Sequence, residues 1–429
     1  MNNGTPERPA PPAPRPLAAA SDPRAWRGGL RGKWPSIAVI LFAQVTAMAV
    51  WFASAAAASA LARSAPLSGF ESALLTSAVQ AGFVIGTLAS ALLGLPDRFD
   101  PRRIFLISAL GAAGASAALV MLPPTGPGIL ALRFLTGMAL AGVYPIGMRL
   151  AATWAKGDLG LLVGLLVGAL TLGSASPHAL AALAELDWRV IYLAAAGLAL
   201  CGGLAILAAG VGPNAPRQIR LEPGRISQAW RNPALRLTNL GYLGHMWELY
   251  AMWTWLAVFL AESFRLSGLA DPRGVGELVT FGAIAAGAVG AWLGGVCADR
   301  WGRTTVTIAA MAASGACAAA MGWLLGAPPW IVIAVAVVWG ITVIADSAQF
   351  SASIAELSDP ESVGTMLTLQ TCAGFLLTLV SIQLVAPVSH AMGWPTAFTM
   401  LAIGPVLGCL AMARLRASPE SRRLAGGRR

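Results

Sequence analysis

Charged residues are scarce in this chain. Asp, Glu, Lys and Arg make up 11% of its 429 residues, whereas an average soluble domain carries about 25%. Cysteine is sparse too: the five residues lie singly inside apolar runs and never at CxxC spacing, which argues against a disulfide framework and a metal site. Hydrophobic residues account for 57% of the chain. This composition indicates a membrane protein without a metal or other cofactor.

Catalytic and nucleotide-binding patterns are lacking as well. No nucleophile, base and acid occur at matching depth in the expected membrane segments. The nearest approach to a phosphate loop, residues 28–34, has the wrong spacing and no Ser or Thr after Lys33. The net charge of +10 is spread between apolar runs, not along a basic face interleaved with aromatics, which argues against nucleic-acid binding. We therefore expect neither an enzyme nor an ATP-driven pump.

Twelve mostly apolar runs are long enough to cross a bilayer as helices, which takes about 20 residues each. Their predicted ranges are 34–62, 72–95, 104–122, 129–153, 159–184, 190–211, 236–261, 276–298, 304–325, 331–355, 362–387 and 394–413. The predicted organisation is a disordered tail (1–33), a six-helix bundle (34–211), a linker (212–235), a second six-helix bundle (236–415) and a basic tail (416–429).

The distribution of positive charge predicts how the helices are oriented. An even number of crossings places both termini on one side, and 24 of the 29 Lys and Arg residues then fall on that side. Loops on the cytoplasmic side of a membrane are enriched in Lys and Arg. We expect an inner- or plasma-membrane protein with both termini in the cytoplasm.

Two short charged turns indicate that the chain is built twice. Asp97 and Asp299 each lie between two apolar runs, 202 residues apart, and each is followed by Arg. The second turn reads Gly295-x-x-x-Asp299-Arg300-x-Gly302-Arg303, and the first reads Pro96-Asp97-Arg98-Phe99-Asp100-Pro101-Arg102-Arg103. Two similar six-helix halves are typical of secondary transporters with parallel repeats.

These turns resemble the signature of the Major Facilitator Superfamily. The first copy departs from the pattern, because its glycine, Gly94, is one place late and Asp100 replaces the second glycine. The fourth run is similar to the family's arginine-containing motif, reading Ile129-x-x-x-Arg133-x-x-Thr136-Gly137-x-Ala139-x-Ala141. The resemblance implies an all-α membrane protein with two pseudo-symmetric bundles that works by alternating access. It also links Arg133 to proton coupling.

The resemblance further implies that the charged turns act as a latch on the cytoplasmic side. The residues we expect in this latch are Asp97, Arg98, Arg102, Asp299, Arg300, Arg303 and Glu356. Glu356, Asp359 and Glu361 form an acidic cluster that suits the arginines as partners. The alternative is that these charges only set the topology.

Small residues recur in the fifth and eighth predicted helices, at Gly160, Gly164 and Gly168 and at Gly290 and Gly294. Small-xxx-small spacing lets helix backbones approach closely in lipid. In the resembled family these helices line the boundary between the halves, where a sliding contact needs smooth surfaces. The alternative is that the glycines serve ordinary tight packing, and both can hold.

Ionisable residues inside a membrane are functional candidates, because burying them is costly. Arg133, Glu248 and Asp346 are the candidates for proton coupling, whereas Arg149 lies near a helix end and can extend to the surface. His245 and Glu248 are three residues apart, share a helix face and are suited to exchanging a proton. The expected substrate-binding residues are Gln44, Tyr144, His245, Glu248, Trp253, Asp346 and Gln349. The alternative is a static polar network between helices.

The function that follows is secondary active transport of a small solute by alternating access, coupled to protons, by a monomer in the lipid bilayer. Two substrate alternatives stay open: import of a small anion of the cyanate or nitrate type, and efflux of a drug or metabolite. A different class, a membrane sensor on a transporter fold that moves no solute, also stays open.

Overall fold

The computed structural model describes residues 29–65, 67–156, 158–183, 187–214, 223–359 and 361–428. All regular structure within these ranges is helical. Most of the predicted tail (1–33) and part of the predicted linker (212–235) lie outside the described residues.

The N-terminal half contains six crossings, of which the first and fourth are each broken into two helices. Its helices are α1 (Lys33–Met48), α2 (Ala53–Ser64), α3 (Gly69–Leu93), the short α4 (Leu95–Arg98), α5 (Pro101–Ala118), α6 (Pro127–Leu140), α7 (Tyr144–Ala152), α8 (Leu159–Ala182) and α9 (Trp188–Ala205).

The C-terminal half repeats this plan. Its helices are the short α10 (Gln228–Arg231), α11 (Pro233–Leu266), α12 (Pro272–Trp301), α13 (Arg303–Met321), α14 (Pro329–Ala345), α15 (Ser347–Leu357), α16 (Val363–Leu401) and α17 (Ile403–Ala417), followed by a 3₁₀ segment at Pro419–Gly427. Here α14 and α15 form one broken crossing.

The crossing count follows from length and composition. Ten segments of the described residues are long and apolar enough to span a membrane. One of them, Val363–Ala417, reverses direction at Gly393, whose φ is 81°, and so crosses twice. α11 is not among these ten because it is less apolar, but its 34 residues are long enough for the remaining crossing. The predicted twelve-helix, two-bundle fold is confirmed.

Proline and polar caps explain where several helices begin. Proline suits the first turn of a helix because its missing N–H would have no partner there. Asp100 precedes Pro101 and accepts a hydrogen bond from the Arg102 N–H at 2.9 Å. Asn232 and Asp271 cap α11 and α12 in the same way. The Asp-Pro pair that departs from the repeat motif is therefore the start of α5.

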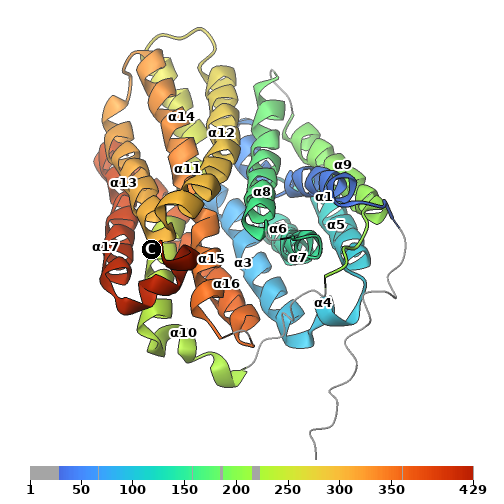
Figure 1. Cartoon of the computed structure of the whole chain (residues 1–429). Helices are drawn as coiled ribbons and strands as arrows, with labels where there is room; N and C mark the ends of the chain where they lie inside the picture. Colours follow the sequence, from blue (N-terminus) through green and yellow to red (C-terminus); the bar gives the residue numbers. More distant parts are fainter. Residues whose placement is uncertain are drawn as a thin grey trace, which may run out of the picture.

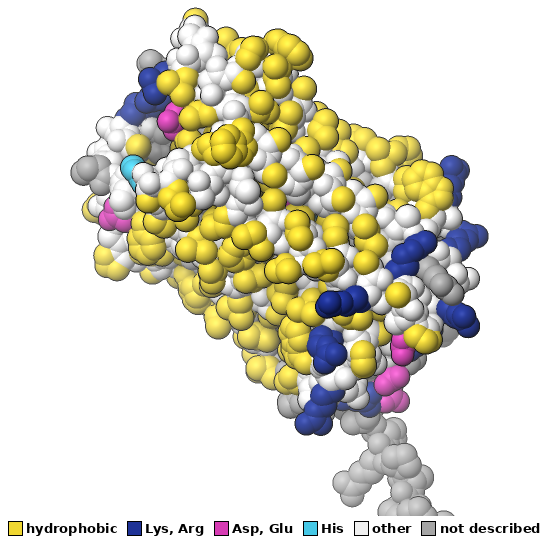
Figure 2. Space-filling view, turned by 90° about the vertical axis from the view of Figure 1, so that its left-hand side faces the viewer, with side chains coloured by type: hydrophobic (Ala, Val, Ile, Leu, Met, Phe, Trp, Pro, Cys, Tyr) yellow, Lys and Arg dark blue, Asp and Glu magenta, His cyan; other side chains and the backbone are white. Residues whose placement is uncertain are grey.

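The two halves lie side by side, with the N-terminal half coloured blue to green and the C-terminal half yellow to red in Figure 1. Two helix pairs form the largest contacts between them: α3 packs against α16, and α8 packs against α12. Both termini of the described chain and the connection between the halves lie at one end of the bundles, here called the termini end; the opposite end is called the far end. Hydrophobic side chains cover the middle of the surface in Figure 2, and most of the visible Lys and Arg residues gather at one end.

Glycines allow the closest helix contacts. A β-carbon on Gly290 would lie 2.0 Å from the Ile341 carbonyl oxygen, and one on Gly294 would lie 1.9 Å from that of Ala345. Both partners belong to the α14 crossing, so these two glycines serve the ordinary tight packing that the sequence left open, while α12 itself does pack against α8 of the other half. Gly164 and Gly168 do face the other half, on α12.

Gly294→Ala is expected to destabilise the protein, whereas Gly295→Ala is expected to leave its stability nearly unchanged. A methyl group at 294 overlaps backbone, which costs about 1–3 kcal/mol when a packed interior is overfilled. A β-carbon on Gly295 meets no atom within 4 Å. Thermal unfolding of the two purified variants measures the difference. Equal melting temperatures would contradict the close packing of α12 on α14.

Candidate functional site

Three crossings are broken near the middle of the bundles, and the candidate site is built around these breaks. α1 and α2 are separated by residues 49–52, α6 and α7 by residues 141–143, and α14 and α15 by Asp346. Broken helices at mid-membrane are typical of transporter binding sites, because they turn polar groups toward a protein-lined centre. The predicted site residues Tyr144 and Asp346 lie at two of these breaks.

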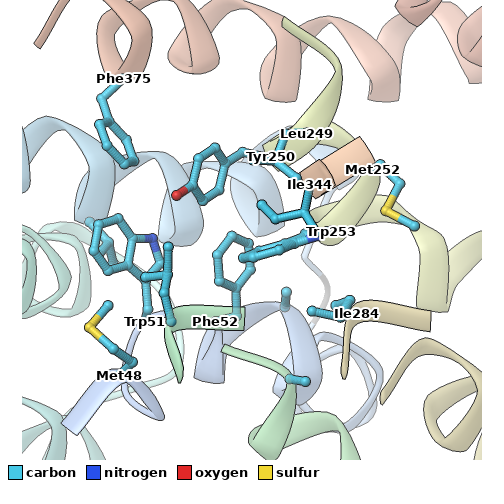
Figure 3. Close-up of a cluster of buried hydrophobic side chains, with 14 of the residues drawn as sticks. Met48, Trp51, Phe52, Leu249, Tyr250, Met252, Trp253, Ile284, Ile344 and Phe375 are labelled. Atoms are coloured by element: carbon cyan, nitrogen blue, oxygen red, sulfur yellow. The ribbon is translucent and has the colours of Figure 1, made fainter. Parts of the chain in front are cut away.

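Aromatic side chains from both halves meet at the centre, as Figure 3 shows for most of them. We call them the aromatic cluster: Trp51, Phe52, Phe83, Tyr250, Trp253 and Phe375. The rings of Phe83 and Phe375 have centroids 4.7 Å apart, and those of Phe52 and Trp253 are 5.4 Å apart. The indole N–H groups of Trp51 and Trp253 have no hydrogen-bond partner. The predicted site residue Trp253 thus belongs to the aromatic cluster in which side chains of the two halves contact each other.

Arg133 supports the break between α1 and α2. Its side chain is fully buried and donates hydrogen bonds to the carbonyls of Val50 at 2.9 Å, Trp51 at 2.6 Å and Leu75 at 3.3 Å. The Tyr192 ring lies below the guanidinium, 5.8 Å away. No carboxylate contacts Arg133 within the described part of the chain. Two of these carbonyls, those of Val50 and Trp51, lie in the break between α1 and α2, so the guanidinium is committed mainly to backbone oxygens that the break leaves free.

His245 pairs with Asp346 and not with Glu248. The His245 Nδ1 atom lies 2.9 Å from an Asp346 carboxylate oxygen, and both side chains are almost fully buried. The atoms are not aligned for a hydrogen bond, so their attraction depends on charge. The predicted His245–Glu248 pair is wrong, because a shared helix face does not decide which way each side chain turns.

Glu248 points away from the centre, toward α13 and α14. Its carboxylate accepts hydrogen bonds from Trp339 Nε1 at 2.6 Å and from Ser314 Oγ at 2.9 Å. These partners match the static network that the sequence left open as the alternative for this residue.

Aromatic residues surround the His245–Asp346 pair. The ring centroid of His245 lies 5.7 Å from that of Phe350 and 6.0 Å from that of Tyr242. Tyr144 begins α7 in the other half. Tyr242 and Phe350 escaped the sequence analysis, because aromatic residues are ordinary in membrane helices. Their spacing from His245 and Asp346 along the helices is the signal that could have found them.

The two predicted glutamines occupy different places. Gln44 is fully buried, and neither atom of its amide has a hydrogen-bond partner; its oxygen packs against Gly147 of α7. Gln349 accepts a hydrogen bond from Arg303 at 2.8 Å and thus belongs with the charged turn. Of these two glutamines, only Gln44 has polar atoms without a hydrogen-bond partner.

The charged turns make ion pairs within each half. Asp97 binds Arg149 at 2.6 Å, which ties the α3–α5 turn to α7. Asp100 binds Arg102 at 2.7 Å. Arg303 binds Glu356 at 2.6 Å, which ties the α12–α13 turn to α15. Arg98, Asp299 and Arg300 are exposed.

Other contacts hold the chain ends and the connection at this end. Glu361 pairs with Arg225 of the connection at 2.6 Å. The Glu356 carboxylate also accepts a hydrogen bond from the Ala425 N–H at 2.9 Å, which fixes the C-terminal segment. Lys33 donates to Asp158, and this bond, with the Lys156 N–H, lowers the pKa of the Asp158 carboxyl.

Asp97→Asn is expected to lower both stability and transport, whereas Asp299→Asn is expected to change neither. The first variant removes the charge that holds a largely buried arginine, and breaking such a charged bond costs about 1–3 kcal/mol. The Asp299 side chain is exposed, and within the described residues only its backbone carbonyl is bonded, by Arg428. Melting temperature and transport rate of both variants check this. Equal losses in the two would favour a shared latch role.

The described residues hold no group of three His, Cys, Asp or Glu side chains arranged for a metal ion. Twelve crossings in two bundles, with polar and aromatic groups at helix breaks in their centre, define a membrane transporter and not an enzyme.

The chain belongs to the Major Facilitator Superfamily, which matches residues 40–382. Its structure is similar to that of the "MFS (major facilitator superfamily) proton:xylose symporter XylE bound to 6-bromo-6-deoxy-D-glucose", with a TM-score of 0.66. The likeness covers 89% of this chain and 96% of that one at 14% sequence identity, and it shows the fold alone. A search of curated proteins found no match. The family predicted from the charged turns is confirmed.

Proposed function

We propose that this chain is a proton-coupled secondary transporter of a small organic solute, with His245 and Asp346 as its proton-binding pair. The observation that carries the proposal is the position of this pair. It is buried at the break between α14 and α15, next to the rings of Tyr242 and Phe350. With a neutral imidazole and an ionised carboxylate, the His245–Asp346 pair carries one negative charge. One added proton makes the pair neutral overall, which changes how strongly it holds neighbouring polar groups.

The charges near the centre favour an organic solute over an inorganic anion. An anion site needs an available cationic side chain. Arg133 donates its hydrogen bonds to carbonyls, and Arg149 is paired with Asp97. Aromatic faces and the free amide of Gln44 suit a solute with an apolar body and a few polar groups. The similar symporter is named for a sugar, and this chemistry is compatible with that class.

The orientation and organisation complete the proposal. The concentration of Lys and Arg at the termini end supports a cytoplasmic location for that end. The far end would then face outward from an inner or plasma membrane. The two bundles (34–211 and 236–415) would move against each other within one monomer, with the linker 212–235 between them.

A two-step measurement tests the function. A thermal-shift screen at pH 5.5 and pH 7.5 of pentoses and hexoses, tetraphenylphosphonium, nitrate and cyanate identifies solutes that stabilise the purified protein. Uptake of each hit into proteoliposomes is then measured with and without an imposed pH gradient. We expect an organic hit that accumulates only with the gradient. Nitrate or cyanate as the accumulated solute would support the anion importer, and binding without accumulation would support the sensor.

A further inference from the structure

A second titratable pair joins the two halves at the far end. His178 Nδ1 lies 2.6 Å from a carboxylate oxygen of Glu277. His178 belongs to α8 in the N-terminal half, and Glu277 belongs to α12 in the C-terminal half. The exposed fraction of the side chain is 0% for His178 and 7% for Glu277. This pair is separate from His245–Asp346, which lies within the C-terminal half.

The pair lies where the interface between the halves is closed. On the other side of the interface, Gln383 of α16 donates a hydrogen bond to Ser77 of α3 at 3.1 Å. A β-carbon on Gly69, at the far end of α3, would lie 3.1 Å from the Ala386 side chain. The α8–α12 contact and the α3–α16 contact are therefore both closed at the far end.

The α8–α12 contact weakens toward the termini end. A β-carbon on Gly168 would meet Ala288 at 3.4 Å, and one on Gly164 would meet Ala291 at 3.6 Å. Continuing this register brings Gly160 toward Gly295, yet a β-carbon on either would meet no atom within 4 Å. The structure thus shows the far end closed and the termini end of this contact loosened.

Other charged groups near the far end do not neutralise Glu277. On α12, Arg273 is exposed, and on α11 Glu262 is bonded to Trp394. The remaining charges on the elements that pack against α8 at this end are satisfied elsewhere. Arg63 of α2 bonds the Ser59 carbonyl, and Arg189 of α9 pairs with Asp187. Among the described residues, His178 is thus the one partner of this carboxylate.

Burial then determines the number of protons on the pair. A carboxylate buried beside a neutral imidazole would be an uncompensated charge, which costs several kcal/mol. One additional proton, on either His178 or Glu277, makes the pair neutral overall. Two further atoms indicate that the site is not fully satisfied by protein groups: His178 Nε2 and Ser174 Oγ are buried without a hydrogen-bond partner, four residues apart on one face of α8.

We infer that His178 and Glu277 form a proton-binding site that closes the far end of the transporter. Separating the halves exposes both groups to water, where Glu titrates near pH 4.3 and His near pH 6.5. Above about pH 6.5 the opened pair therefore releases the proton that the closed pair holds. Acid favours the closed far end, and each pH unit above this value favours opening by up to tenfold, the slope for one proton. In the proposed orientation, the site would respond to external pH.

Distance measurements between spin labels test this inference without any substrate. Labels are placed on Met121→Cys in the N-terminal half and Trp330→Cys in the C-terminal half, two exposed positions near the far end, in a full-length variant whose five native cysteines are replaced by alanine. Distances are measured by double electron–electron resonance in lipid nanodiscs at pH 5.5 and pH 8.5. We expect the ratio of long to short distances to rise at least tenfold at the higher pH.

Matched variants separate titration from simple weakening of the interface. Glu277→Gln should abolish the opening at high pH, because the site then lacks the carboxylate whose burial requires the additional proton. His178→Gln should keep a pH dependence but move its onset from about pH 6.5 toward pH 4.3, because Glu277 alone must then hold the proton. Its distance ratio should therefore already rise between pH 5.5 and pH 6.5, where that of the wild type is level. Ser77→Ala removes the hydrogen bond that does not titrate, so it should favour the open form at both pH values and keep the pH dependence. Asp346→Asn should also keep it, which separates this inference from the proposed function. A wild-type distribution that ignores pH, or opening at high pH that persists unchanged in Glu277→Gln, would overturn the inference. If Glu277→Gln fails to fold, His178→Gln decides: an onset equal to that of the wild type would overturn the inference.

Discussion

Asp346→Asn is expected to abolish proton-driven accumulation of the substrate, by a factor of ten or more, while the protein still binds it. The substitution keeps the size of the side chain but removes its charge, so His245 loses the partner that makes its protonation favourable. Uptake into proteoliposomes with an imposed pH gradient measures accumulation, and the thermal shift caused by the same solute measures binding. Exchange of labelled for unlabelled solute, which needs no proton movement, should persist.

Glu248→Gln is the matched control for this experiment. It removes a second buried carboxylate from α11, but one that binds Trp339 and Ser314 away from the centre. A glutamine can accept from Trp339 and donate to Ser314, whose hydroxyl can reverse its role. We expect a small loss of stability and continued proton-driven accumulation. If Glu248→Gln abolishes accumulation and Asp346→Asn does not, the proton-binding pair has been assigned to the wrong residues.

Arg133→Ala is expected to be the most destabilising single substitution among those considered. It leaves the buried carbonyls of Val50 and Trp51 without their donor, and each unsatisfied group costs about 1–3 kcal/mol. Since Val50 and Trp51 lie in the α1–α2 break, we expect the aromatic cluster to lose its arrangement as well. The melting temperature should fall by roughly 5 °C or more.

Arg133→Lys separates the two interpretations of this arginine. A lysine keeps the charge but cannot reproduce the planar set of donors that reaches three carbonyls. If Arg133 supports the helix break, the lysine variant should also be destabilised. If Arg133 instead acts mainly in proton coupling, the lysine variant should melt near the wild-type temperature but show altered pH dependence of uptake.

The fold was predictable because hydrophobic length is a property of contiguous sequence. A run such as 159–184 predicts a crossing on its own, and it corresponds to α8 at Leu159–Ala182. The Asp-Arg turns then indicated the repeat and the family. The partners of individual side chains were harder to predict from the sequence, because they depend on how the helices are rotated relative to one another.

Three sets of contacts illustrate this limit. Glu248 was expected to pair with His245 along one helix, but bonds from α13 and α14 turn its carboxylate elsewhere. Arg149 was expected to extend to the surface, but Asp97 holds it. His178 and Glu277 were not paired at all, because no sequence pattern connects two positions in different halves. Helix spacing predicts which residues share a face, whereas a contact between halves requires the packed structure.

The reversal at Gly393 affects how the protein is inserted into the membrane. The chain turns back there with a φ of 81°, and Trp394, the next residue, already bonds Glu262. With almost no loop between them, the last two crossings can enter the bilayer only as a hairpin. A residue with a β-carbon at 393 strains this conformation. The defect expected from such a substitution is therefore a misplaced C-terminus, seen as altered topology during biosynthesis and not as slower transport.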